Sequence, residues 1–127
     1  METIEIKLGQ LDFIISSLSN LVTKELPIKL SYRLSKLIKV LANEHELYNQ
    51  NKNEIIKKYA EKDEEGNIKQ LEDNKINILS PNEYQRNLEE LHLLGFEVLF
   101  EKIKIDELGD INISVQDLLN LDKFITD

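Results

Sequence analysis

Two histidines and two groups of carboxylates are the side chains of this sequence best suited to acid–base or metal chemistry. A zinc-binding helix needs a second histidine four residues after the first, and none follows His45 at that spacing. Joint metal binding by His45 and His92 would need a third ligand, which the sequence does not identify. We therefore expect both histidines to pack against helices or face solvent, and we expect no metal site.

The carboxylates gather beside glycines. One group is Asp63, Glu64 and Glu65 before Gly66, and the other is Asp106, Glu107 and Asp110 around Gly109. Catalytic carboxylates need a dry cleft that shifts their pKa values, whereas turns beside glycine leave carboxylates in water. The second group also lacks the spacing of a calcium loop. Cysteines, a glycine-rich phosphate loop and a nucleophile elbow are absent as well. We expect no cofactor and no enzymatic activity.

Four basic side chains form a more specific pattern on a predicted helix. They follow one another at spacings of four, three and three residues, which places them on one face: Lys29, Arg33, Lys36 and Lys39. This face is expected opposite a ridge of leucines. It is either an ordinary solvated face or a contact surface for nucleic acid, for an acidic protein or for the acidic half of the same chain. Together with Asp63, Glu64 and Glu65, these residues are the candidate interaction residues.

The charge is distributed unevenly along the chain. Residues 1–60 contain nine basic and seven acidic side chains (net +2), and residues 61–127 contain seven and seventeen (net −10), which together give −8. A net negative field opposes binding to nucleic acid. An acidic surface can imitate the phosphates of nucleic acid, although most acidic surfaces only maintain solubility.

Length and composition favour one domain covering residues 1–127. A hydrophobic fraction of 41% with 31% charged residues is typical of a globular protein. No apolar run approaches the roughly 20 residues that a membrane span needs, so we expect no membrane partner. The N-terminus does not resemble a signal peptide, and we expect a location in the cytoplasm.

Hydrophobic periodicity predicts a predominantly helical α+β fold. An amphipathic helix is expected over 8–24, and a long helix over 27–61 begins at Pro27 and forms an antiparallel hairpin with the first. A β-hairpin or flap is expected over 67–79. A third helix over 81–94 begins with the capping-box pattern of Ser80, Pro81 and Glu83. A strand with a bulge or bend is expected over 96–105, and Ser114 begins a short helix over 114–121.

Three segments resemble small uncharacterised proteins of tailed phages and prophages of low-GC Gram-positive bacteria. They are Leu26–Leu37, Lys57–Asn67 and Ile113–Leu121, in the same order. The resemblance implies expression inside an infected bacterium and offers no catalytic residues.

The leading functional expectation is a non-enzymatic phage protein that binds another protein, from the host or the phage, through helix faces. Its sharpest form is an anti-defence inhibitor of a host defence complex, in the manner of an anti-CRISPR protein. The alternative is a self-associating accessory protein of the virion or its assembly, in the head, neck or tail, and a homo-oligomer is then expected.

Overall fold

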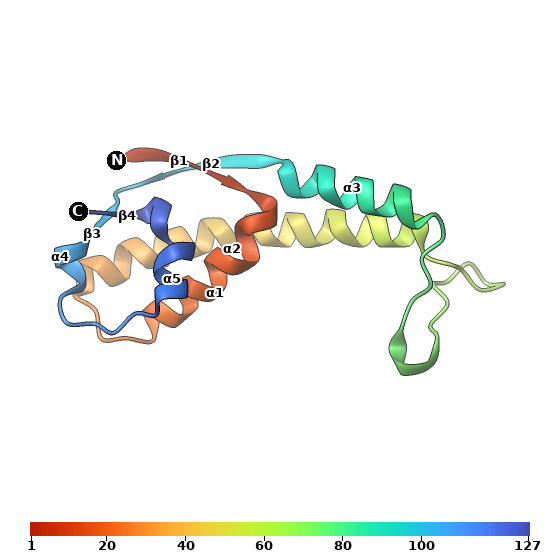
Figure 1. Ribbon diagram of the computed structural model, residues 1–127, viewed down its shortest axis with the longest axis horizontal. Helices are drawn as coiled ribbons and strands as arrows, with labels where there is room; N and C mark the ends of the chain where they lie inside the picture. The colour runs from red at the N-terminus through yellow and green to blue at the C-terminus, as the bar shows by residue number, and fades with distance from the viewer.

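The chain folds into a head and a stalk that share one long helix (Figure 1). The computed structural model describes residues 1–127 and is α+β, mostly helical. The head contains both termini, the small sheets and the first half of the long helix. The stalk contains the second half of that helix, a third helix beside it, and a flap at the far end.

Two helices and a two-stranded sheet build most of the head. Helix α1 (Leu11–Val22) and helix α2 (Ile28–Tyr59) form the predicted antiparallel hairpin, which turns around Pro27. Strand β1 (Glu2–Lys7) pairs antiparallel with β2 (Gly95–Phe100), from Glu2 opposite Phe100 to Lys7 opposite Gly95. Backbone hydrogen bonds across one ladder therefore join the first residues of the chain to a segment that begins only at Gly95.

The C-terminal segment completes the head. Strand β3 (Ile103–Lys104) pairs in parallel with β4 (Ile125–Thr126). Helix α4 (Ile105–Leu108) and helix α5 (Val115–Asn120) lie between these strands in the sequence. Ser114 caps α5 as expected, since its Oγ accepts a hydrogen bond from the Asp117 backbone N–H at 3.1 Å.

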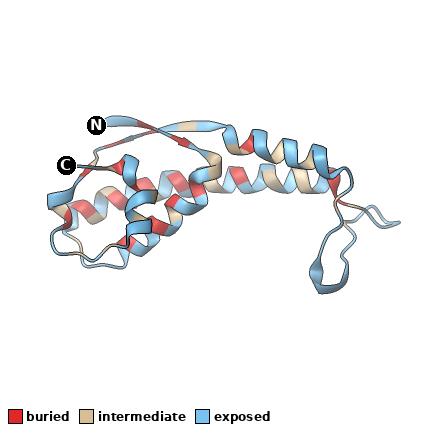
Figure 2. Ribbon diagram, viewed as in Figure 1, coloured by how far each residue is buried: buried red, intermediate tan, exposed pale blue.

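The core lies in the head (Figure 2). The leucine ridge of α2 is buried as the periodicity predicts, and it packs with one face of α1, alternate residues of both long strands and the C-terminal segment. The core residues are Ile4, Ile6, Leu11, Ile14, Leu18, Leu21, Leu30, Leu34, Leu37, Leu41, Val98, Phe100, Ile103, Leu108, Leu121 and Phe124.

The stalk is held by aromatic and polar contacts between α2 and α3 (Pro81–Leu93). Tyr48 is buried, and its hydroxyl lies 3.0 Å from Nε2 of His92. Nearer the flap, the rings of Tyr59 and Tyr84 meet edge to face, and Asn87 donates a hydrogen bond to the Tyr59 hydroxyl. These contacts support the distal part of α2, where few apolar residues are available.

The flap spans residues 60–79 and contains isolated antiparallel bridges in place of a continuous sheet. Gln70 pairs with Ile76 inside the segment predicted as a hairpin. Two further bridges join Lys62 to Ile68 and Ala60 to Ile78, so the flap begins earlier than predicted. Helix α2 ends at Tyr59 because Ala60 adopts an extended conformation and pairs with Ile78.

The prediction of one strand over 96–105 is wrong beyond Phe100. Strand β2 ends there, and Ile103 and Lys104 pair with a different strand, β4. Ile105 already belongs to α4. The expected bend therefore lies between two strands that belong to different sheets. Residues 95–100 pair with β1, whereas residues 103–104 pair with β4.

Two further expectations fail locally. The predicted capping box does not form, because Ser80 is in the left-handed region (φ 55°) and its side chain makes no capping hydrogen bond. Pro81 nevertheless occupies the first turn of α3, as predicted. The helix predicted over 8–24 divides into a 3₁₀ turn at Leu8–Gln10 and α1.

Candidate functional site

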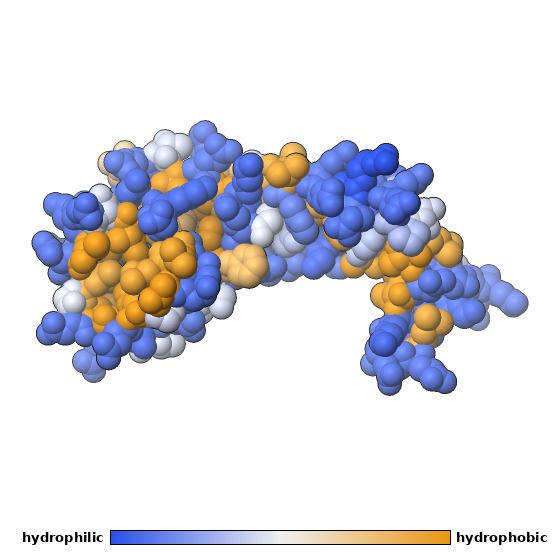
Figure 3. All heavy atoms as spheres, in the orientation of Figure 1, coloured by the Kyte–Doolittle hydropathy of each residue, from blue (hydrophilic) through white to orange (hydrophobic).

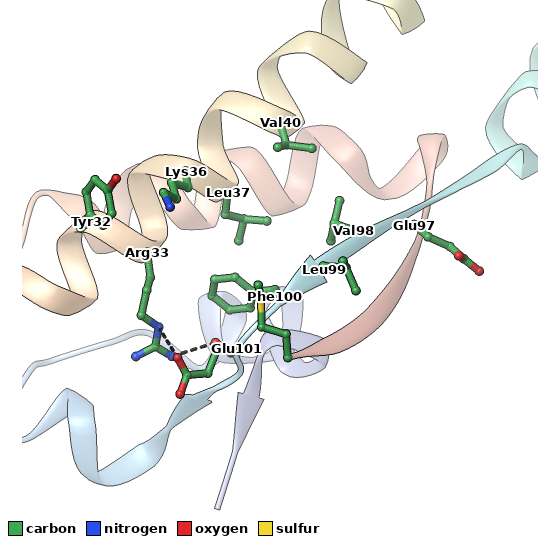
Figure 4. A pocket seen from close by; sticks show the side chains of 11 residues that line it. Tyr32, Arg33, Lys36, Leu37, Val40, Glu97, Val98, Leu99, Phe100 and Glu101 are labelled. Carbon is green, nitrogen blue, oxygen red and sulfur yellow. Dashed lines mark hydrogen bonds and ion pairs between the residues drawn. The ribbon is translucent and has the colours of Figure 1, made fainter.

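The largest hollow of the molecule is an open groove between α2 and β2, which we call the α2–β2 groove (Figure 4). Its volume is about 660 Å³. Its walls are mostly apolar and come from Met1, from Tyr32, Arg33, Lys36, Leu37 and Val40 of α2, and from Glu97, Val98, Leu99, Phe100 and Glu101. Leu99 is 67% exposed and Tyr32 is 62% exposed, so the groove presents apolar side chains to solvent.

One wall of the groove is the unpaired edge of β2. The sheet has two strands, so β2 has β1 as its only hydrogen-bonded neighbour. At the end of the ladder the Leu8 N–H donates to the Leu94 carbonyl at 2.9 Å. Hydrogen-bonded pairs alternate along an antiparallel ladder. The N–H and C=O groups of Gly95, Glu97 and Leu99 therefore point away from β1, and they have no backbone partner.

The outer edge of β1 is occupied by lysine side chains. Lys123 donates from Nζ to the Glu5 carbonyl at 3.1 Å, and Lys102 pairs with the Glu2 carboxylate at 3.1 Å. Lysine on an edge strand hinders pairing with another chain. The two edges of the sheet thus differ, since that of β1 is protected and that of β2 opens onto the groove.

Arg33 closes one end of the groove by binding the segment that follows β2. Its Nη2 donates to the carbonyls of Glu101 (2.7 Å) and Lys102 (3.0 Å), and its Nη1 lies 2.6 Å from a Glu107 carboxylate oxygen. The side chain is only 20% exposed. Hydrogen bonds from the Lys104 backbone N–H and from Arg33 hold the pKa of Glu107 below its ordinary value. Arg33 therefore joins α2 to the acidic half of the chain, which is one of the contacts that the sequence suggested.

The other three members of the predicted basic face remain on the surface. The Lys36 ammonium lies 4.7 Å from the centre of the Tyr32 ring and forms no ion pair. Lys29 and Lys39 are exposed, likewise form no ion pair, and do not line the groove. Of the two alternatives that the sequence left open, a solvated face describes Lys29, Lys36 and Lys39. Arg33 instead contacts the acidic half of the chain, because its long side chain reaches the segment after β2.

The acidic candidates Asp63, Glu64 and Glu65 lie in the flap, at the opposite end of α2 from Lys29 (Figure 1). Helix α2 is about 48 Å long at 1.5 Å per residue, so the structure does not bring the two candidate groups together. Oδ1 of Asp63 accepts hydrogen bonds from the backbone N–H groups of Glu65 and Asn67. Asp63 therefore stabilises a turn, while Glu64 and Glu65 are exposed.

Both histidines contribute to contacts between helices. His45 of α2 lies 2.6 Å from the Asp12 carboxylate of α1, and His92 of α3 lies 3.0 Å from the Tyr48 hydroxyl. Burial and the nearby charge of Asp12 raise the pKa of Tyr48. The structure contains no group of three or more histidine or carboxylate side chains placed to hold a metal ion.

A polar cluster joins α5 to α1. Ser17, which is 1% exposed, donates to the Asp117 carboxylate at 2.8 Å and accepts a hydrogen bond from Asn120 at 3.0 Å. The hydrogen bond from Ser17, with further ones from Asn20 and Ser114, lowers the pKa of Asp117. No buried polar side-chain atom of this cluster lacks a partner, and the cluster fixes α5 against α1.

A second apolar patch lies on the face formed by α1 and α5 (Figure 3). Its exposed members are Phe13, Val115, Leu118 and Leu119. The hollow beside Phe13 and Leu119 is smaller, about 400 Å³, and only three of its eight lining residues are hydrophobic. No unpaired strand borders it, so the α2–β2 groove is the stronger candidate for a binding site.

Sequence reasoning did not find the apolar residues of the groove. Tyr32 and Val40 lie outside the leucine ridge, which is a signal that α2 has a second apolar row. Leu99 is an apolar residue on the polar side of an alternating strand. Sequence reasoning also missed β1, although the alternation of apolar and polar residues over Glu2–Lys7 is a strand signal.

Comparison with known proteins gives no relative, since no protein-family model, no curated protein and no solved structure matches this chain. None of its helices combines the length and the apolar character needed to cross a bilayer.

Proposed function

We propose that this chain is a non-enzymatic protein that binds another polypeptide in the α2–β2 groove, as an extended strand added to β2. The observation that carries the proposal is the unpaired edge of β2 beside exposed apolar side chains. A strand laid along β2 would supply hydrogen-bond partners for the outward backbone groups of Glu97 and Leu99.

The side chains of the groove favour a strand with apolar residues. Tyr32 and Val40 of α2 and Leu99 of β2 are exposed in the structure and would be covered by the added strand. Burial of apolar surface contributes about 25 cal/mol per Å². Main-chain hydrogen bonds then supply affinity. The apolar walls select added strands whose every second side chain, the one that faces the groove, is apolar.

The non-enzymatic part of the proposal is supported by the positions of the reactive side chains. His45, His92 and Asp117 each bind a side chain of another element, with His45 joining α2 to α1 and His92 joining α3 to α2. None of the three lines the α2–β2 groove. Their contacts hold the helices in position.

The resemblance to phage and prophage proteins supports a bacterial host as the setting. In the leading form of the proposal, the bound polypeptide belongs to a host defence complex, which the chain inhibits in the host cytoplasm. In the second form, the chain is a self-associating accessory protein of the virion or its assembly. The second form is favoured by the free edge of β2, since an unpaired strand is a template for its own copy.

The experiment compares Leu99→Lys with Leu119→Lys. The two leucines are equally exposed, at 67% and 66%, but Leu119 lies on α5 outside the groove. Each tagged variant is isolated from an infected low-GC Gram-positive host, and bound proteins are quantified by mass spectrometry. We expect Leu99→Lys to lose its partner and Leu119→Lys to keep it. We also expect the partner to protect the backbone amides of Glu97 and Leu99 from hydrogen exchange.

Two results would contradict the proposal. One is a partner that binds Leu99→Lys as well as the wild type. The other is a complex in which amide exchange at Glu97 and Leu99 is the same as in the free protein.

A further inference from the structure

We infer that the strand taken up by the α2–β2 groove is β2 of a second copy of this chain, so that the protein forms a two-fold dimer with a continuous four-stranded sheet. The inference rests on the second, self-associating form of the proposed function and names the strand through which two copies associate. The strand order of the dimer is β1-β2-β2-β1, and the only free edges left are those of β1. These edges already hold the side chains of Lys102 and Lys123.

The backbone of β2 is suited to pairing with its own copy. The outward N–H and C=O groups belong to alternate residues, Gly95, Glu97 and Leu99. Two copies of β2 can pair antiparallel about a two-fold axis so that the outward backbone groups of one copy face those of the other. This condition allows the axis to pass at Glu97, at Val98 or at Leu99. At the end of this edge the Glu101 carbonyl is already bound by Arg33, which limits the new ladder to the residues before it.

Charge selects one of the three registers. With the two-fold axis at Glu97, the Glu97 carboxylates of the two copies face each other. With the axis at Leu99, Glu97 of one copy faces Glu101 of the other. Like charges directly opposite each other destabilise a sheet. A centre on Val98 places Glu97 opposite Leu99 in both halves of the dimer. The two pairs of Glu97 and Leu99 then exchange their backbone hydrogen bonds, and Phe96 lies opposite Phe100.

The ends of the groove are complementary in charge under this two-fold axis. Lys36 lies toward one end, near Tyr32 and Arg33, and Glu97 lies at the other end (Figure 4). Neither forms an ion pair within one copy. Antiparallel pairing reverses the second strand, so Glu97 of each copy moves toward Lys36 of the other. The same strand covers the exposed side chains of Tyr32 and Val40.

Sedimentation equilibrium over a range of concentrations tests the dimer. We expect the wild type to reach twice the chain mass of 14.8 kDa. Leu99→Glu should remain a monomer, because the register places residue 99 of each copy opposite Glu97 of the other, where like charges destabilise the sheet. Leu119→Glu is the matched control and should dimerise like the wild type. Circular dichroism of all three proteins establishes that they are equally folded.

A charge-exchange experiment tests the register. Lys36→Glu alone and Glu97→Lys alone should each weaken the dimer by roughly tenfold, because each variant replaces two attractive surface contacts with repulsive ones. An equimolar mixture of the two variants should form a heterodimer of wild-type affinity, since both contacts then join opposite charges.

A wild type that stays monomeric up to about 100 µM overturns the inference, as does a dimer that Leu99→Glu leaves intact. A mixture of the two charge variants that is no tighter than either alone overturns the register. None of these results contradicts the leading form of the proposed function, which is tested separately by the binding of a heterologous partner to Leu99→Lys and by amide exchange at Glu97 and Leu99.

Discussion

Replacing Arg33 with methionine should destabilise the head far more than the same change at Lys39. Both residues belong to the basic face predicted on α2. Arg33 binds the Glu107 carboxylate and the carbonyls of Glu101 and Lys102, whereas Lys39 forms no ion pair. Arg33→Met keeps much of the aliphatic length of the side chain and removes the charged donors.

The magnitude follows from burial and from the number of acceptors. A fully exposed ion pair contributes ~0.2–1 kcal/mol, and a hydrogen bond to a charged group ~1.5–3 kcal/mol. At 20% exposure Arg33 lies between these limits. Its loss removes a hydrogen-bond donor from two carbonyls and from Oε2 of Glu107. We expect Arg33→Met to lower the free energy of unfolding by about 2–4 kcal/mol. A surface change such as Lys39→Met should alter it by less than about 0.5 kcal/mol.

Urea denaturation followed by circular dichroism measures both variants at one protein concentration, since self-association would make stability depend on concentration. A double-mutant cycle with Glu107→Gln separates the ion pair from the hydrogen bonds to the carbonyls, and we expect a coupling of about 1 kcal/mol or more. Equal urea midpoints for Arg33→Met and Lys39→Met would refute the view that Arg33 joins α2 to the acidic half of the chain.

Three further predictions concern the stalk, the pH response and the flap. Tyr48→Phe keeps the buried ring and removes the hydroxyl contact with His92, so we expect a loss of ~1 kcal/mol in thermal unfolding. The folded pKa of Glu107 lies below its ordinary 4.5, so its contribution is fully present above pH 4.5 and is lost as pH falls through the folded value. The stability difference between wild type and Glu107→Gln, measured by urea denaturation, should therefore shrink below about pH 4.5. Asp63→Ala should speed hydrogen exchange at the Glu65 amide, and thermal unfolding should change by less than about 0.5 kcal/mol.

Each of these predictions has a contrary outcome. A Tyr48→Phe protein as stable as the wild type would show that the hydroxyl is equally well bound by water in the unfolded chain. A stability difference between wild type and Glu107→Gln that does not vary between pH 3 and pH 7 would contradict the lowered pKa. Glu64→Ala is the control for the flap, because Glu64 is exposed and forms no ion pair, and it should leave exchange at the Glu65 amide unchanged.

The local features of the helices could be predicted because they depend on neighbours in the sequence. The leucines of α2 repeat at helical spacing, and all four of the main ridge are buried: Leu30, Leu34, Leu37 and Leu41. Ser114 caps α5, and Pro81 begins α3. In each case the signal and its physical cause lie within a few residues of each other.

The strands were harder to predict because their partners are distant. Residues 96–105 alternate well enough to be one strand, but Val98 pairs with Ile4 and Ile103 pairs with Ile125. The periodicity of a strand gives its faces and not its neighbour. The same limit applies to Arg33, whose exposure depends on where the chain passes after β2.

The sequence by itself determined that this protein is mostly helical, that its second helix is long, and that one of the faces of this helix is basic, since these properties follow from local periodicity and composition. Only the tertiary structure decided which cations remain free, where the acidic residues lie, and that β2 has an unpaired edge beside apolar side chains. These features depend on contacts between residues far apart in the chain, such as Arg33 with Glu107 and Ile4 with Val98. No local pattern specifies such contacts, because their free energy appears only when the head is packed.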